Sequence, residues 1–308
     1  MRVLVLGAGA VGGYFGGRML QAGADVTFLV RERRAEQLRK DGLVIRSPQG
    51  DATLRNPAIA VGQPGSEFDL VLLTCKAYDL DSAIQAITPA VGPDTVVLPM
   101  LNGMRHLDTL DERFGSDHVI GGYCAIAATL DADGAIVHLN RLHELRFGER
   151  DGSVTGRVSA IEKVMATAKV DGRLSRSILH DMWEKWVMLS TLAGITCLMR
   201  ASIGAITSAP GGQDLTLQLL EECAAVAGAH GYAPREASWQ RMRGILTEPG
   251  SAFTASMLRD IERGSRIEAD HVIGNLIARA DCYRVATPVL RTAFCHLKAY
   301  ENNVRREK

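Results

Sequence analysis

Short apolar runs alternate with amphipathic stretches over the first half of the chain. Each run is continuous rather than alternating, which is typical of strands in a parallel sheet that is covered on both faces. The expected strands are residues 3–6, 26–30, 70–73 and 96–98. The segments between them have helical spacing, at 11–22, 34–41, 79–88 and 105–114. This order of elements predicts an α/β fold with a doubly wound, Rossmann-type sheet.

The pattern changes along the second half of the chain. Antiparallel strands are expected to close the sheet near 125–130, 135–139 and 144–148, with a hairpin turn after the first of them. Long helical patterns then follow at 177–199, 213–229, 252–263 and 268–284, and a last helix opens near Pro288. We therefore predict a Rossmann domain over residues 1–174. A mostly α-helical domain for substrate binding and dimerisation is predicted over residues 175–308.

Composition excludes several classes of protein. Lys plus Arg and Asp plus Glu number 35 each, and this zero net charge argues against a nucleic-acid partner or an anionic membrane surface. The six cysteines form no CxxC pair and the eight histidines no HExxH motif, so no metal site is expected. No apolar run approaches the roughly 20 residues of a membrane span. The expectation is a cytoplasmic protein with reduced thiols.

A glycine-rich turn follows the first expected strand directly. Its spacing, Gly-x-Gly-x-x-Gly, places Gly7, Gly9 and Gly12 around Ala10 and Val11. In this context the first glycine permits the tight turn, the second lets a pyrophosphate approach the backbone, and the third allows close packing of helix on strand. These five residues are predicted to bind the diphosphate of a dinucleotide at the helix N-terminus. The alternative is a glycine turn that binds no ligand.

Charge at the end of the second expected strand indicates which dinucleotide binds. An acidic residue there accepts the ribose 2′-hydroxyl of NAD, whereas NADP needs a cation for its 2′-phosphate. Arg31 occupies this position, with Arg33 and Arg34 within reach of the same phosphate. A guanidinium can bond two phosphate oxygens, so NADPH is the predicted cofactor. Glu32 would repel the phosphate if it pointed inward, and a solvated charge run is the alternative.

Further segments resemble the ketopantoate reductase family and run through nearly the whole chain in the family's order. They are LGAGAVGG near the N-terminus, CKAYD from Cys75, LNGM from Leu101, MWEKW from Met182 and SMLRDIERGSRIEADHVIGNLIARA from Ser256. The resemblance implies an NADPH-dependent enzyme that reduces a 2-oxo acid to a 2-hydroxy acid, nominally 2-dehydropantoate (ketopantoate) to pantoate. It also implies that a helical C-terminal domain closes over the cleft of the Rossmann domain.

The resemblance also assigns roles to matching residues. Lys185 would be the catalytic lysine and proton donor, and Lys76 and Asn102 would lie beside the nicotinamide half of the cofactor. Ser256 would hold the substrate carboxylate, and Glu268 would contact the substrate hydroxyl as a second catalytic residue. Asn102 and Lys185 would bind the substrate as well. The chemistry agrees, because hydride delivery to a ketone leaves negative charge on oxygen, and a cation that donates a proton can neutralise it.

Two of these residues have plain structural alternatives. Lys185 could be a surface lysine that pairs with Glu184, its neighbour in sequence. Glu268 could be a carboxylate in the first turn of a helix, where it would complement the helix dipole. Agreement with the other segments favours the functional roles.

One departure from the family pattern concerns the substrate. The family's pattern is similar to Lys-x-x-x-Asn-x-x-x-Asn, which places three polar side chains on one helix face. In this chain the lysine is Lys185, and Leu189 and Ala193 stand where the two asparagines would be. These side chains cannot make the usual pair of hydrogen bonds. A less polar 2-oxo acid, or a ketone without the terminal hydroxyl of ketopantoate, is therefore a candidate substrate.

Two other functions remain open from the sequence. A related 3-hydroxyacid or opine-type dehydrogenase would share the two-domain layout and a catalytic lysine or histidine. A non-catalytic NADPH sensor would need neither Lys185 nor Glu268, so the presence of both argues against it. Apolar residues on the C-terminal helices suggest a homodimer.

Overall fold

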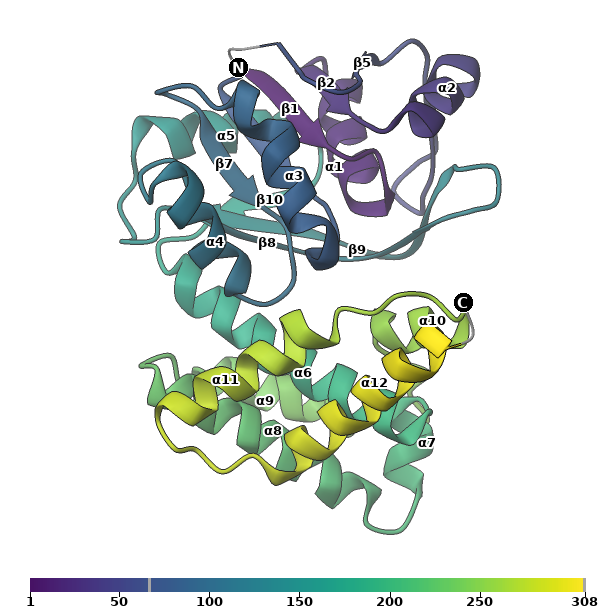
Figure 1. Cartoon of the computed structure of the whole chain (residues 1–308), viewed down its shortest axis with the longest axis vertical. Coiled ribbons are helices and arrows are strands. Elements are labelled where there is room, and N and C mark those ends of the chain that lie inside the picture. The colour runs from purple at the N-terminus through teal and green to yellow at the C-terminus, as the bar shows by residue number, and fades with distance from the viewer. Residues whose placement is uncertain (66–67, 307–308) are drawn as a thin grey trace. The chain divides into compact units, whose positions relative to one another are not determined.

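The computed structural model describes residues 1–65 and 68–306, and the chain divides into two compact units (Figure 1). The first unit contains Met1–Leu101 and His106–Leu179. The second contains the chain from His180 onward together with Asn102–Arg105, although this short segment follows a strand of the first unit in sequence. The boundary expected from the sequence lay slightly earlier, at residue 174.

Five parallel strands form the central sheet of the first unit, in the order β5-β2-β1-β6-β7. Their bounds are β1 (Arg2–Leu6), β2 (Asp25–Leu29), β5 (Ala58–Ala60), β6 (Leu70–Leu73) and β7 (Val96–Pro99). Because β1 pairs with β2 on one side and with β6 on the other, the sheet is wound in both directions from its centre. The predicted doubly wound α/β fold is therefore confirmed. Only the three-residue β5 was not expected in this sheet.

Five α-helices of the first unit lie between its strands along the described chain. They are α1 (Ala10–Gln21), α2 (Glu32–Asp41), α3 (Leu80–Ile87), α4 (Arg105–Phe114) and α5 (Gly156–Thr167). Helix α1 packs against the parallel sheet and also against a second sheet. A methyl group on Gly16 would lie 2.8 Å from Phe28 of the first sheet, and one on Gly17 would lie 2.8 Å from Leu43 of the second. The glycines of α1 therefore allow it to lie close to both sheets.

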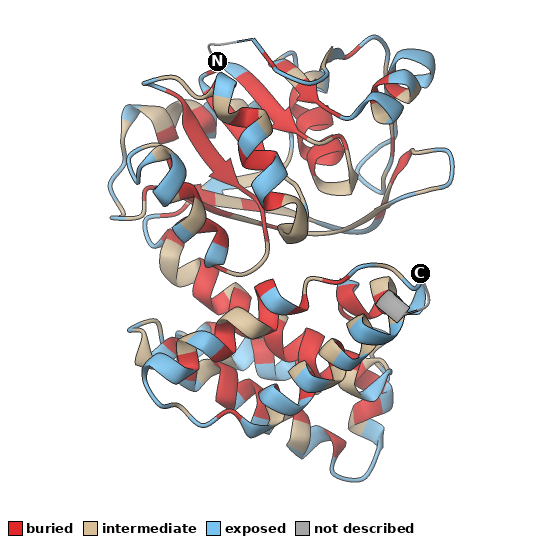
Figure 2. Cartoon of the chain, viewed as in Figure 1, coloured by how far each residue is buried: buried red, intermediate tan, exposed pale blue. Residues whose placement is uncertain are grey.

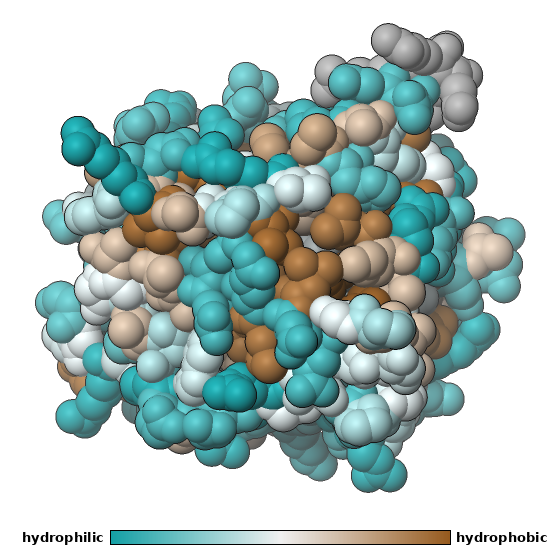
Figure 3. Space-filling model, turned by 90° about the horizontal axis from the view of Figure 1, so that it is seen from below, coloured by the Kyte–Doolittle hydropathy of each residue, from teal (hydrophilic) through white to brown (hydrophobic). Residues whose placement is uncertain are grey.

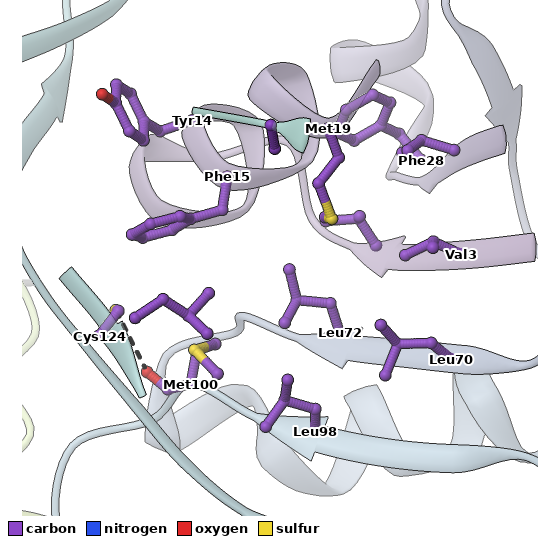
Figure 4. Packing of buried hydrophobic residues seen from close by; sticks show 14 of the residues in the cluster. Val3, Tyr14, Phe15, Met19, Phe28, Leu70, Leu72, Leu98, Met100 and Cys124 are labelled. Atoms are coloured by element: carbon purple, nitrogen blue, oxygen red, sulfur yellow. Dashed lines mark hydrogen bonds between the residues drawn. The ribbon is translucent and has the colours of Figure 1, made fainter. Parts of the chain in front are cut away.

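The core of the first unit lies between α1 and the parallel sheet. Phe15 and Met19 of α1 face Val3 and Leu72 of the sheet, and all four side chains are fully buried (Figure 4). Buried residues follow the strands and the inner face of α1 continuously (Figure 2). Losing one buried phenyl ring from such a core costs roughly 3–5 kcal/mol of stability. This packing fixes the position of the turn between β1 and α1.

The predicted antiparallel strands are present, but they do not close the parallel sheet. β8 (Gly121–Leu130) pairs antiparallel with β9 (Ile136–Gly148), which forms a second sheet with β3 (Leu43–Arg46), β4 (Ala52–Leu54) and β10 (Asp171–Leu174). The strands expected at 135–139 and 144–148 are one continuous strand, because the ladder to β8 accommodates the polar residues between them with a register shift at Ile126/Ala128. This part of the topology prediction was wrong.

The second unit is helical, as predicted. Its helices are α6 (Ile178–Met199), α7 (Ile203–Ser208), α8 (Gly212–Ala229), α9 (Glu236–Leu246), α10 (Ser256–Glu262), α11 (Asn275–Cys282) and α12 (Pro288–Arg306). A methyl group on Gly194 of α6 would lie 2.9 Å from Leu219 of α8, so these two helices are in close contact. None of the helices in the described chain combines the length and the apolar character needed to cross a membrane.

The helix expected over 268–284 has two parts. A π-helical turn, η3 (Asp270–Gly274), precedes α11, and α11 continues directly from it. Trp186 of α6 donates its indole N–H to the carbonyl of Val272 within this turn, at 2.9 Å. Widened π-turns occur often at functional sites, because they change the direction in which side chains project.

Candidate functional site

The glycine turn lies at the carboxyl end of β1. Gly7 has φ +93°, a left-handed conformation that favours glycine, and its N–H donates to the carbonyl of Leu29 at 2.9 Å. A Cβ on Gly12 would lie 2.2 Å from the carbonyl oxygen of Gly7 and 2.2 Å from Oγ1 of Thr74. Only glycine therefore allows α1 to approach the end of β6 this closely. Thr74, which the sequence reasoning did not single out, donates its hydroxyl to the Leu6 carbonyl at 2.7 Å.

The N-terminus of α1 is open to an anion. Gly9 is the N-cap, no side-chain cap is found among the described residues, and a Cβ on Gly9 would meet nothing within 4 Å. Ala10 and Val11 form the first turn, which carries no acidic residue. The first N–H groups of a helix have no acceptor within the helix and carry its positive partial charge. The open space at Gly9 and the uncapped N–H groups fit the diphosphate of a dinucleotide.

The charged residues after β2 separate into different environments. Arg31 is 81% exposed, and its Nη2 lies 3.3 Å from Oδ2 of Asp79, in the short turn after β6. Glu32 pairs with Arg39 at 2.9 Å on the surface of α2, so its carboxylate is already neutralised by a neighbouring cation. Arg33 is exposed. Arg31 is therefore placed where it can meet an anion from solvent.

Arg34 differs from the other two arginines. It is partly buried, and its guanidinium donates to the carbonyl oxygens of Ala8 and Gly134 and to the side chain of Gln37. Burial lowers the pKa of Arg34 below its usual value. The contacts of Arg34 are to the protein itself, whereas Arg31 lies at the surface.

Lys76 lies at the carboxyl edge of the parallel sheet. It is exposed and precedes the short turn Ala77–Asp79 that leads into α3. The carboxyl ends of neighbouring parallel strands lie at one edge of a sheet, and ligands bind in the crevice outside that edge. Since β6 pairs with β1, Lys76 follows the strand next to the glycine turn.

A lysine and an amide meet in the second unit. Nζ of Lys185, on the first half of α6, donates to Oδ1 of Asn102 at 3.1 Å. Asn102 belongs to the short segment that joins this unit, and both side chains are partly buried. The structure thus brings together two residues that are far apart in sequence and that the family resemblance assigned to one site.

The alternative role of Lys185 was a surface ion pair with Glu184, but Glu184 binds Arg235. Its carboxylate accepts the backbone N–H and Nε of Arg235, each at 2.8 Å. Burial opposes ionisation of Glu184, but the hydrogen bonds and charge of Arg235 hold its pKa below the usual value. Glu184 therefore anchors α6 to the start of α9 as a buried carboxylate.

His271 lies beside Asn102, and Glu268 lies near His271. His271 is 7% exposed, hydrogen-bonds with the backbone of Asn102, and is close enough to Glu268 and Arg105 to feel their charges. Burial lowers the pKa of His271, while Glu268 and the hydrogen bond to Asn102 act in the opposite direction. Gly103 has φ +74°, and a Cβ there would lie 3.1 Å from the carbonyl oxygen of His271. Asn102, Lys185 and His271 therefore form one cluster, and Glu268 lies near His271.

The sequence reasoning missed His271. Its signal was present, because a histidine within a run that is otherwise apolar, His-Val-Ile-Gly, marks a polar group on a buried face. Glu268 itself immediately precedes the helical turn, and its carbonyl accepts the N–H of Val272 at 3.0 Å. Its place at a helix start agrees with the structural alternative as well as with the functional role.

Ser256 lies elsewhere on the unit. It is exposed and is the first residue of α10. The N–H of its neighbour Ala255 donates to Oγ1 of Thr196 at 3.3 Å, near the C-terminal end of α6. Thr196 is about 16 Å from Lys185 along the helix axis. The structure therefore places Ser256 by the far half of α6.

The stripe that follows Lys185 along α6 is apolar. Leu189 is partly buried and Ala193 is 1% exposed. The hydroxyl of Thr191 donates to the Val187 carbonyl at 2.9 Å, on its own helix, and so does not replace the missing amides. Within the described chain, no group of three or more acidic, histidine or cysteine side chains could hold a metal ion.

Comparison with known proteins identifies the same two parts. Residues 3–152 match the family profile described as ketopantoate reductase PanE/ApbA, and residues 177–301 match the profile of its C-terminal domain. The chain is 38% identical over 301 residues to the uncharacterized oxidoreductase YkpB of Bacillus subtilis, covering 98% of this chain and 99% of YkpB. It is 27% identical over 294 residues to a 2-dehydropantoate 2-reductase of Halobacterium salinarum, covering 95% and 96% of the two chains.

A solved structure has the same fold over the whole chain. The PanE/ApbA family ketopantoate reductase from Ralstonia eutropha superposes with a TM-score of 0.88 at 25% identity. The match covers 99% of this chain and 100% of the other. Both units described above are therefore parts of one shared architecture.

Proposed function

Because the chain belongs to the ketopantoate reductase family of oxidoreductases, we propose that it reduces a 2-oxo acid to the 2-hydroxy acid with NADPH. The observation that carries the proposal is the hydrogen bond between Lys185 and Asn102. The amide oxygen of Asn102 orients the ammonium group of Lys185. Glu184, the neighbour that a simple surface pair would use, is engaged by Arg235 instead.

Lys185 is assigned the central chemical role. The bound cofactor supplies a hydride, and the ammonium of Lys185 stabilises the negative charge on the former ketone oxygen and donates a proton to it. Asn102 restricts the ammonium to one direction, which reduces the entropy lost in reaching the reactive geometry. Glu268 would accept a hydrogen bond from the substrate hydroxyl. Ser256 lies by the far half of α6 and is given no role in this step.

NADPH, rather than NADH, is supported by Arg31. This arginine follows the second strand, is exposed, and pairs with the surface carboxylate of Asp79. Gly7, Gly9, Ala10, Val11 and Gly12 would hold the diphosphate, and Lys76 would lie toward the nicotinamide half. A D-mandelate dehydrogenase with this fold (20% identity, TM-score 0.86, 99% of each chain) has been solved with NADH, so cofactor choice within the fold needs a direct test.

The substrate is proposed to be less polar than ketopantoate. Leu189, one turn along α6 from Lys185, is apolar and partly buried, and Ala193 is buried. A site that lacks a polar partner loses its preference for a substrate hydroxyl, and an apolar wall favours an alkyl or aryl group. Ketopantoate remains the nominal substrate of the family, and an apolar 2-oxo acid is the second candidate.

A substrate panel tests the proposed function directly. Loss of NADPH absorbance is followed with ketopantoate, branched aliphatic 2-oxo acids and an aryl 2-oxo acid, and kcat/KM is compared. Turnover of any of them supports the reductase function. NADPH binding without turnover of any would favour the sensor, and turnover only with an added amine would favour an opine-type dehydrogenase.

The assembly and location proposed are a homodimer in the cytoplasm. A ketopantoate reductase from Staphylococcus aureus with this fold is described as dimeric (22% identity, TM-score 0.81, 99% of this chain and 100% of that chain). In this chain, Met199 and Phe253 of the second unit are exposed large hydrophobic residues, which a second copy could cover.

A further inference from the structure

We propose that Arg34 is a positioning residue for the cofactor turn, and that it sets affinity for NADPH and NADH alike. The inference rests on the proposed function, because it assumes that the glycine turn binds a dinucleotide. It assigns to Arg34 a role different from that of Arg31, three residues earlier. Arg31 would recognise the 2′-phosphate, whereas Arg34 would hold the backbone that recognises the diphosphate.

Arg34 connects three segments that are distant in sequence. Its Nε donates to the carbonyl oxygen of Ala8 at 3.0 Å, in the glycine turn. Its Nη1 donates to Oε1 of Gln37 at 2.6 Å, on α2, and to the carbonyl oxygen of Gly134 at 2.8 Å, in the turn between β8 and β9. A planar guanidinium can serve all three acceptors at once, which a lysine ammonium cannot do with the same geometry.

The contact with Ala8 controls the direction of a neighbouring donor. The carbonyl of Ala8 and the N–H of Gly9 belong to one planar peptide unit, and in a trans peptide they point in opposite directions. Holding the Ala8 carbonyl therefore also fixes the Gly9 N–H. Gly9 is the N-cap of α1 and faces open space, so its N–H is one of the groups that would meet the diphosphate.

The hairpin turn is rigid enough to support Arg34. Oδ1 of Asp131 accepts the N–H of Asp133 at 3.0 Å and that of Ala135 at 2.8 Å, and Oδ2 accepts Nη1 of Arg46 at 2.6 Å. The Gln37 side chain also donates to the carbonyl of Asp133. The turn is therefore closed on itself and fastened to α2, so the Gly134 carbonyl is a fixed acceptor.

One further atom distinguishes Arg34 from a surface residue. Its Nη2 is buried and has no hydrogen-bond partner among the described residues. A buried guanidinium with an unmet donor is unfavourable for stability alone. A role in fixing the backbone of the glycine turn would explain why a residue with this unfavourable burial occurs here.

The two arginines are expected to have different cofactor signatures. The diphosphate is common to NADPH and NADH, so a residue that shapes its binding turn affects both to the same degree. The 2′-phosphate occurs only in NADPH, so a residue that binds it affects NADPH alone. Comparing the two cofactors therefore separates the roles of Arg34 and Arg31.

Calorimetric titration of the cofactor-free full chain with NADPH and with NADH tests the proposal. In Arg34→Met we expect Kd to rise about tenfold for both cofactors, as for the loss of one charge-assisted contact. The rate kcat at saturating NADPH should stay near wild type, since Arg34 acts through binding. The matched control is Lys40→Met, an exposed cation on the same helix, and its Kd values should change less than about twofold.

Thermal melting of each variant shows whether it is folded at the titration temperature. If Arg34→Met is not folded, Arg34→Lys retains the charge and the long side chain, and a smaller, equal rise for both cofactors is expected. Unchanged Kd values in a folded Arg34 variant would refute the inference and leave the proposed function intact. A rise for NADPH alone would refute it too, by making Arg34 a 2′-phosphate ligand. A wild-type protein that binds neither cofactor would overturn the proposed function and the inference together.

Discussion

Arg31 projects into solvent from the start of α2, and its ion pair with Asp79 is a surface contact. A 2′-phosphate can displace that carboxylate at little cost, because exposed ion pairs contribute about 0–1 kcal/mol. We predict that Arg31→Ala raises KM for NADPH about 10- to 150-fold, as for the loss of about 1.5–3 kcal/mol, and leaves NADH use nearly unchanged. Steady-state kinetics with both cofactors measures this. Equal use of NADH and NADPH by the wild type would contradict it.

Lys185 is oriented by Asn102 and is expected to act mainly in the transition state. We predict that Lys185→Met lowers kcat about 10²–10⁴-fold, while the Kd for NADPH stays near wild type. Kinetics on the best substrate of the panel, with fluorescence titration of NADPH, measures both quantities. If the variant retains more than about a third of wild-type kcat, Lys185 is an ordinary helix lysine.

Glu268 should behave differently from Lys185. A contact that orients the substrate serves the ground state and the transition state, so Glu268→Ala should change both KM and kcat. Since both residues would act on one bound substrate, the effects in the double variant with Lys185→Met should be less than additive. Additive effects would indicate that Glu268 does not act on the substrate and serves only as a carboxylate at the helix start.

His271 gives the cluster a pH dependence. Because burial lowers its pKa below the reference value of 6.5, the unfolded chain binds a proton at a higher pH than the folded chain does. The free energy of unfolding should therefore fall as pH drops below about 6.5, until the lowered pKa of the folded state is reached. We predict that His271→Gln makes the loss of Tm between about pH 7.5 and pH 5.5 smaller.

His143 provides a comparison for this measurement, because it is a second histidine whose pKa is lowered by burial but it belongs to the first unit. His143 lies on β9, with the Arg18 guanidinium nearby. His143→Gln should reduce the same slope without changing the pH profile of kcat. An unchanged slope in His271→Gln would show that protonation of His271 does not destabilise the fold.

At the scale of elements, strands with continuous apolar runs were predictable and strands with mixed patterns were not. Buried strands such as β6 are apolar on both faces, so their sequence alone marks them. By contrast, β4 and β5 have three residues each, and their alternating exposure carries no reliable period. The long β9 contains a polar, exposed stretch that imitates a turn. Such pairings depend on partners far away in sequence, which no local pattern specifies.

The candidate site was predictable to a similar extent. The glycine turn could be predicted from its own residues because a local backbone conformation determines it. Lys185 could be proposed only from resemblance, since a lone lysine on a helix carries no signal of its own. The segment that carries Asn102 joins the helical unit through its contacts with α6 and His271. No spacing in the sequence predicts these contacts.

Helix α6 should determine substrate choice. Since Leu189 and Ala193 replace the family's amides, we predict that wild-type kcat/KM is higher for a branched aliphatic 2-oxo acid than for ketopantoate. Leu189→Asn, at a partly buried position, should raise kcat/KM for ketopantoate relative to the aliphatic acid. Leu189→Met is the control, because it keeps an apolar surface. Wild-type activity on ketopantoate at about 10⁴–10⁶ M⁻¹s⁻¹ would show that other groups replace the amides.

At the scale of the whole molecule, the second unit exposes large apolar side chains that an interface with another chain would bury. Hydrophobic side chains gather in a patch among hydrophilic ones on the face shown in Figure 3. Met199 at the end of α6 is 42% exposed, and Phe253 is 43% exposed. The N–H of Ile203 donates to the carbonyl of Phe253 at 3.0 Å, so the loop that carries Phe253 lies beside the residues that follow Met199.

We predict that the protein is a homodimer that uses the apolar region around Met199 and Phe253. Light scattering after size-exclusion chromatography should give twice the chain mass of 33.2 kDa. A stable dimer buries about 800 Å² on each partner, more than two side chains provide, so Phe253→Asp should weaken the dimer by placing a desolvated charge in its interface. Tyr283→Asp is the matched control, because Tyr283 is 56% exposed and lies at the end of α11. A wild-type monomer at micromolar concentration, or a Phe253→Asp variant that stays dimeric while Tyr283→Asp dissociates, would refute this interface.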